Sequence, residues 1–156
     1  SFMLSYIKLF SLPMGGSLTL CSMLPIAAYA CAFGPLYGFV AGLAFGMLQL
    51  IQDFYVIHWA QLLLDYFFAF ACYGIAAYFP NKLTLGIAVA GLCRMLCSTL
   101  SGGIFFADSA VDAGWSNAWL YSLAYNGSTI GAETVLCVLV SLLPPVKKVL
   151  GLMKSE

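Results

Sequence analysis

Long apolar stretches alternate along the chain with short breaks that hold proline, glycine or polar residues. The apolar stretches lie near residues 1–12, 18–33, 36–51, 58–79, 83–106 and 118–143. Because a helix needs about 20 apolar residues to cross a bilayer, the last three are long enough to span it alone. The second and third are shorter and suit a thin or locally adapted bilayer. The pattern predicts an all-α membrane protein, a six-transmembrane-helix bundle that forms a single domain over residues 1–156.

Three local features refine this prediction. The first stretch, residues 1–12, is too short to cross a bilayer, and we expect it to be the outer half of a helix that is truncated at its start. Pro25 is expected to kink or interrupt the second helix. Gly38, Gly42 and Gly46 recur at a spacing of four residues, which predicts that another helix backbone approaches this face closely.

The composition excludes a soluble domain. Hydrophobic residues make up 63% of the chain and charged residues 8%, with a mean hydropathy of +0.99, whereas soluble domains carry about 25% charged residues. The formal net charge is zero and no basic run is present, so nucleic acid is not an expected partner. The six cysteines lie inside apolar stretches without metal-ligand spacing, so neither a metal nor a cofactor is expected.

The sequence carries no motif for catalysis. It has no G-x-x-x-x-G-K-[ST] phosphate loop and no H-E-x-x-H metal pattern. His58 is the only histidine, and it has no plausible partners for a Ser-His-Asp triad. The sequence therefore indicates that the protein is not an enzyme.

Basic residues near the helix ends predict the orientation. In membrane proteins, the cytoplasmic connections between helices carry more lysine and arginine than the connections on the outer side. The lysines in the fourth-to-fifth connection and in the tail fall on one side of a six-helix bundle, and aspartates fall in the opposite connections: Lys82, Lys147, Lys148 and Lys154 against Asp53, Asp108 and Asp112. We therefore expect a multi-pass protein of the cell membrane with a cytoplasmic C-terminus.

Three charged residues lie inside apolar stretches: Asp65, Arg94 and Glu133. Such residues mark a site or a pair, because a charge in lipid is costly. At 1.5 Å per residue, Asp65, Ser98 and Asn126 lie about 11 to 12 Å below the outer face, and Arg94 and Glu133 about 18 to 22 Å below it. Our hypothesis is that Arg94 and Glu133 form a structural ion pair, which leaves Asp65 to meet a cationic ligand from outside. The alternative is that Asp65 pairs with Arg94 and both only hold helices together.

Aromatic residues are frequent above these two layers. They are Tyr55, His58, Trp59, Tyr66, Phe105, Phe106, Trp115, Trp119, Tyr121 and Tyr125. Each one alone is typical of the aromatic belt at a membrane interface, for which Trp59 is a good candidate. Together with a buried carboxylate, they resemble a cage for a planar or cationic ring.

Four stretches of the sequence resemble one known family. They are Leu12–Ser17 (LPMGGS), His58–Tyr66 (HWAQLLLDY), Ser101–Phe106 (SGGIFF) and Trp119–Asn126 (WLYSLAYN). They resemble the thiamine-specific substrate-binding subunit (S-component) of bacterial energy-coupling-factor importers, in the same order and over nearly the whole chain. The resemblance implies six helices, a thiamine site near the extracellular face under a lid loop, and transport across the plasma membrane.

The resemblance also implies which residues bind the ligand. Asp65 matches the acidic residue that faces the cationic vitamin, and the other matching positions are Tyr55, Tyr66, Phe106, Tyr121 and Asn126, with Gly16 and Ser17 in the lid loop. The sequence departs from the family at Ser98, where the family has a histidine; this loses a stacking surface that Trp115 is a candidate to replace. Implied partners are thiamine, membrane lipid, a transmembrane coupling subunit and two ATPase subunits.

Two other readings of the sequence remain open. The same architecture fits an importer of a thiamine precursor or of another cationic vitamin. It also fits a structural membrane protein whose polar residues only pair helices, which would bind no ligand saturably.

Overall fold

The N-terminal part of the structure is a short helix followed by a β-hairpin. The computed structural model of the chain describes residues 1–12, 17–52 and 54–154. Helix α1 (Phe2–Ser5) precedes strands β1 (Lys8–Ser11) and β2 (Ser17–Thr19), which pair antiparallel. The expectation that residues 1–12 form one helical segment is therefore wrong, because the helix ends at Ser5 and the chain continues as a strand.

The other elements of the described chain are all helices. The elements are α2 (Leu24–Phe33), α3 (Pro35–Gln52), α4 (Trp59–Leu62), η2 (Leu63–Phe68), α5 (Ala69–Ala71), η3 (Cys72–Tyr78), α6 (Leu83–Phe105), α7 (Ala107–Asp112), α8 (Ala118–Asn126), η4 (Gly127–Gly131), α9 (Ala132–Ser141) and α10 (Pro144–Lys154). Elements α4 to η3 form one continuous span, and so do α8 to α9. In both, a π-helical turn interrupts the α-helix: η2 in the first and η4 in the second.

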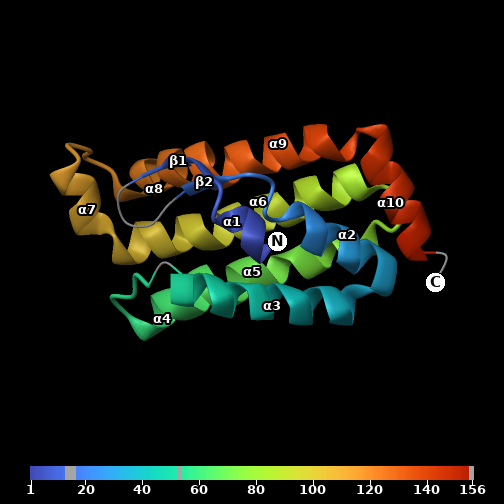
Figure 1. Cartoon of the computed structure of the whole chain (residues 1–156). Coiled ribbons are helices and arrows are strands. Elements are labelled where there is room, and N and C mark those ends of the chain that lie inside the picture. The colour runs from blue at the N-terminus through green and yellow to red at the C-terminus, as the bar shows by residue number, and fades with distance from the viewer. Residues whose placement is uncertain (13–16, 53, 155–156) are drawn as a thin grey trace.

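Four of these helical spans are long and apolar enough to cross a membrane: Pro35–Gln52, Trp59–Tyr78, Leu83–Phe105 and Ala118–Ser141. Helix α2 is apolar but shorter. The spans run side by side along the length of the molecule (Figure 1). The predicted all-helical membrane fold is confirmed, whereas the number of six transmembrane helices stays a prediction.

Helix α2 begins later than the sequence pattern predicts. Residues 17–19 are in strand β2, and the helix starts at Leu24 with Pro25 in its first turn. Proline fits this position because the first amide groups of a helix have no carbonyl partner within it. The expected kink at Pro25 is thus wrong: the proline starts the helix and does not interrupt it.

The predicted glycine contact of α3 is confirmed. Gly38, Gly42 and Gly46 are all buried. A methyl group added at Gly42 would overlap the carbonyl oxygen of Phe70, and one added at Gly46 would overlap that of Tyr66. Helix α3 therefore packs directly on the backbone of the Trp59–Tyr78 span and fixes the position of the π turn η2.

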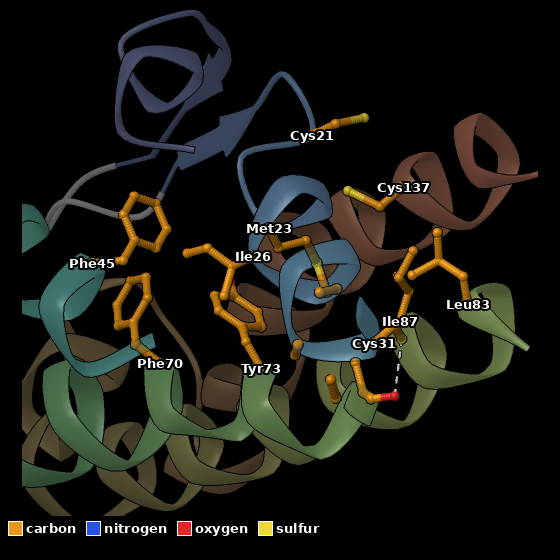
Figure 2. Close-up of a cluster of buried hydrophobic side chains, with 14 residues drawn as sticks. Cys21, Met23, Ile26, Cys31, Phe45, Phe70, Tyr73, Leu83, Ile87 and Cys137 are labelled. Atoms are coloured by element: carbon orange, nitrogen blue, oxygen red, sulfur yellow. Dashed lines mark hydrogen bonds between the residues drawn. The ribbon is translucent and has the colours of Figure 1, made fainter. Parts of the chain in front are cut away.

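Apolar side chains from most of the helices meet in one core. Figure 2 shows Met23 and Ile26 near Tyr73, with Phe45 and Phe70 on one side and Ile87 on the other. The rings of Phe45 and Phe70 pack edge to face, with centroids 5.2 Å apart. This core holds the bundle together below the polar cavity described next.

The outer surface of the spans is apolar. Helix α6 exposes Leu92, Leu96, Leu100 and Ile104, each about half accessible and spaced four residues apart. Residues at this spacing form a stripe along one helix face. A stripe of exposed leucines is stable in lipid and not in water, which agrees with the membrane fold.

Candidate functional site

A polar cavity lies between α6 and the two spans that contain π turns, with strand β2 on one side. Its walls include most of the ligand-site residues that the sequence analysis selects: Ser17, Tyr55, Asp65, Tyr66, Ser98, Phe106, Tyr121 and Asn126. Arg94 and Glu133 also line it. Two selected residues fall elsewhere: Trp115 is outside the lining, and Gly16 lies outside the described residues.

Asp65 projects into the cavity from the π turn η2. Its Oδ2 atom accepts a hydrogen bond from Gln61 Nε2 at 2.9 Å and one from Ser101 Oγ at 2.7 Å. Gln61 is 2% exposed and also donates to the carbonyl oxygen of Tyr55 at 3.3 Å. Two neutral donors therefore fix the carboxylate without neutralising its charge.

Asn126 lies on the opposite wall, immediately before the second π turn, η4. Its Nδ2 atom donates to the carbonyl oxygen of Ser122 at 2.9 Å, which fixes the plane of the amide. Gly102 of α6 faces this pair, and a methyl group there would overlap Ser122 Oγ. Both π turns thus border the cavity, and such turns occur frequently at functional sites.

Aromatic rings form one end of the cavity. The rings of Tyr55 and Phe106 are stacked, with centroids 5.9 Å apart and planes 21° from parallel. Tyr121 lines the cavity and packs edge to face on Trp115, with centroids 6.0 Å apart. Trp115 therefore supports a lining ring from behind. The faces of these rings suit a flat or cationic ligand.

The other two charged residues of the cavity, Arg94 and Glu133, lie close together. Arg94 Nη1 lies 3.5 Å from Glu133 Oε2, and both side chains are largely buried. Arg94 also donates to the Tyr73 hydroxyl, and its guanidinium lies 4.5 Å from the centre of the Phe70 ring. No ion pair between Arg94 and Asp65 is found among the described residues.

Several residues of the site were not selected from the sequence. Gln61 and Ser101 hold Asp65, and Thr19 and Ser22 approach Glu133. Gln61 stands four residues before Asp65, which puts both on one helix face, and this signal could have found it. Thr19 and Ser22 carry no such signal, because they reach the site only through the turn after β2.

His58 has a structural role in the described chain. It is the N-cap of α4, and its Nδ1 atom accepts a hydrogen bond from the amide of Ala60 at 3.1 Å. Its ring stacks on Phe105, with centroids 5.1 Å apart. These contacts fix the start of the span that carries Asp65.

The site contains charged, polar and aromatic groups, and no cluster of His, Cys, Asp or Glu suited to a metal ion occurs among the described residues. Fold and site together define a membrane-embedded protein with a cavity for a small solute. The model of the thiamine transporter protein family matches residues 1–152. The chain belongs to this family: it is a transport protein of the membrane, a thiamine transporter by family, and not an enzyme.

One relative supports this assignment, and one solved structure shares the fold. The chain is 31% identical to the thiamine transporter ThiT of Bacillus subtilis (strain 168) in an alignment of 147 residues, and the match covers 83% of this chain and 75% of that protein. Its fold is similar to a solved structure of ThiT from Listeria monocytogenes, with a TM-score of 0.78 and 20% sequence identity. That match covers 99% of this chain and 87% of the other.

Proposed function

We propose that this cavity is the thiamine site of the chain and that the whole chain acts as one substrate-binding domain, the S-component of a thiamine importer. The charge of the cavity carries the proposal. Three charged side chains line it, and two of them, Arg94 and Glu133, lie together at 3.5 Å. Asp65 leaves one negative charge in a site of low dielectric constant, which favours a cationic guest such as the thiazolium of thiamine.

The remaining lining groups suit the rest of the vitamin. Thiamine carries a flat aminopyrimidine beside its thiazolium ring. Stacking on Phe106 and on the tyrosines Tyr55, Tyr66 and Tyr121 would hold these rings, and the amide of Asn126 would hydrogen-bond a ring nitrogen or the amino group. Ser17, with Gly16, would belong to the segment that closes over the ligand.

Titration of the detergent-purified protein with thiamine tests this proposal, with tryptophan fluorescence as the signal. Trp115 packs on the lining residue Tyr121, so a bound ligand should change its emission. We expect saturable quenching that Asp65→Asn reduces by at least a hundredfold in affinity. Asp108→Asn, at an exposed aspartate of α7, is the matched control and should leave the affinity unchanged.

Two results would contradict the proposal. One is the absence of saturable binding by a protein that is folded by circular dichroism. The other is unchanged affinity in Asp65→Asn, which would assign this carboxylate to helix packing.

Ser98 supports a second candidate ligand. It is buried and lines the cavity where the family resemblance places a histidine. The hydroxyl offers no ring for stacking, so a thiamine precursor or another cationic vitamin is the alternative. Competition of each compound against thiamine separates these ligands, because the true substrate is the tightest competitor.

The proposal extends to orientation and partners. Lys82 lies beside helix α10, since both line one surface cavity, and the positive-inside rule assigns this end of the bundle to the cytoplasm together with the C-terminus. Uphill import would require a coupling subunit and two ATPase subunits. Liposomes that contain the chain alone should bind thiamine without accumulating it, and addition of the three partner subunits with ATP should produce accumulation.

A further inference from the structure

The buried carboxylate of Glu133 connects α9 to the segment that follows the hairpin. Its Oε1 atom accepts hydrogen bonds from Thr19 Oγ1 at 2.6 Å, from Ser22 Oγ at 2.7 Å and from the Ser22 amide at 2.9 Å. Glu133 is 2% exposed. Three donors from one four-residue stretch therefore meet a single oxygen atom.

The other carboxylate oxygen, Oε2, faces Arg94 at 3.5 Å. Arg94 is itself held by the Tyr73 hydroxyl and by the ring of Phe70. The arginine therefore orients the carboxylate and leaves Oε1 directed at the segment after β2. The three bonds from Thr19 and Ser22 satisfy the carboxylate oxygen that Arg94 does not contact.

The backbone between the two donors is strained in a way that these bonds explain. Cys21 has a φ of +53°, a left-handed conformation that is rare for residues other than glycine. Such a conformation persists where its surroundings enforce it. The turn at Cys21 lets Thr19 and Ser22 reach the same oxygen atom, and it places Cys21 beside Cys137 of α9 (Figure 2).

The hairpin extends from this anchored point along the cavity. Thr19 is the last residue of β2, and Ser17 at its other end lines the cavity. Lys8 and Leu9 of the paired strand β1 are exposed. The described polar contacts with the helices lie at the base of the hairpin: Thr19 and Ser22 bond to Glu133, and Ser5, just before β1, bonds to Gln52 of α3.

We propose that Glu133 is a positioning residue that holds the hairpin β1–β2 over the bound ligand and thereby sets how slowly the ligand leaves. The proposal rests on the cavity being the thiamine site. To lift the base of the hairpin, Oε1 of the buried Glu133 must lose three donors, and a buried carboxylate without donors is costly. The closed position is favoured for this reason, and escape of the ligand is slowed more than its entry.

Variants on the hairpin side test this role without leaving Arg94 unpaired. Thr19→Val and Ser22→Ala, combined, remove two of the three donors. We expect the dissociation rate of thiamine, measured by stopped-flow tryptophan fluorescence, to rise about tenfold or more while the association rate changes less than twofold. Thr19→Ser keeps the hydroxyl and should retain slow dissociation.

The matched control removes the same two types of hydroxyl group at positions away from Glu133. Thr99 Oγ1 is buried without a hydrogen-bond partner among the described residues, and Ser128 Oγ donates only locally, to the Tyr125 carbonyl oxygen, in the contacts described. Thr99→Val combined with Ser128→Ala should leave both rates unchanged. A similar rise in dissociation in this control would overturn the proposal.

A second measurement does not depend on the ligand. Amide hydrogen exchange of residues 8–11 and 17–20 should accelerate in the Thr19→Val, Ser22→Ala protein, even without thiamine. Unchanged exchange together with an unchanged dissociation rate overturns the proposal. Faster dissociation with unchanged exchange of these residues also overturns it, because Thr19 and Ser22 line the cavity and would then act as direct ligand contacts. If the wild-type protein binds no thiamine, the proposed function fails, and the exchange experiment still decides whether Glu133 holds the hairpin.

Discussion

The carboxylate of Asp65 depends on neighbours that no charge pattern reveals. Gln61 and Ser101 donate to the same oxygen atom, Oδ2, and Ser101 comes from a different helix. A hydrogen bond to an ionised group contributes more than one between neutral groups. The position of the charge within the cavity is therefore set jointly by the Trp59–Tyr78 span and by α6.

Removal of one of these donors should weaken ligand binding without loss of the fold. We expect Ser101→Ala to lower thiamine affinity on the order of tenfold, since a hydrogen bond to a charged group contributes about 1.5–3 kcal/mol and part of this is regained through rearrangement. Fluorescence titration measures the change. Thr99→Val, on the same helix, is the control, and equal affinities in the two variants would show that Ser101 does not orient Asp65.

The sequence analysis identified individual residues of the cavity where burying them in an apolar segment costs much free energy. A charge in an apolar stretch needs an explanation, so Asp65, Arg94 and Glu133 stand out by themselves, and all three line the cavity. Neutral donors such as Ser101 carry no comparable cost in a transmembrane helix. Their role emerges only when two helices are placed side by side, which explains why the sequence did not reveal them.

At the scale of elements, the glycines of α3 set the position of one wall of the cavity. Because α3 touches the backbone of the Trp59–Tyr78 span at Gly42 and Gly46, the π turn that carries Asp65 has no room to shift towards α3. Close packing of this kind stabilises helix pairs in lipid, where burial of apolar surface between helices contributes little.

Filling this contact should destabilise the protein. Gly46→Ala places a methyl group against the Tyr66 carbonyl oxygen, and overpacking of this kind costs about 1–3 kcal/mol. Thermal unfolding in detergent should show a clearly lower midpoint. The same substitution at Gly127, where the added methyl group would have no heavy atom within 4 Å and φ is −63°, should leave the midpoint unchanged or raise it. Equal midpoints for the two variants would contradict a packing role for Gly46.

Element boundaries were predictable only where apolar runs are long. Spans such as Leu83–Phe105 follow the hydropathy pattern within a residue or two. The hairpin β1–β2 was not predicted, because each strand is only three or four residues long, too short to show a strand period. Helix α10 was not predicted either, since Pro144 and Pro145 indicate a break, although both fit the first turn of a helix.

At the scale of the whole molecule, the two ends of the bundle differ in charge. The end with α10 lies opposite the end with α4 and α7 (Figure 1), and Lys82 lies beside α10. Under the proposed orientation, a cysteine introduced for Ser116 should react with a membrane-impermeant maleimide in intact cells. A cysteine introduced for Asn81 should react only after the cells are permeabilised, and the reverse pattern would contradict the orientation.

The native cysteines should give little background in this experiment. Burial raises the pKa of the Cys21 thiol, so its reactive thiolate is scarce at neutral pH. The other five, which are Cys31, Cys72, Cys93, Cys97 and Cys137, lie within the helices and are free thiols. An impermeant reagent should not reach positions inside the bilayer.

We expect the two π turns to be less stiff than the α-helices beside them. Leu63–Phe68 and Gly127–Gly131 border one cavity from different spans, and a π turn holds its backbone less regularly than the α-helix on either side. Thermal motion should therefore concentrate where the ligand binds, while α3 and α6 remain rigid. Hydrogen–deuterium exchange should show thiamine protecting these two turns more than α3 or α6, and uniform protection would contradict this. Binding would then order the two π turns, and part of the binding enthalpy would offset the conformational entropy that they lose.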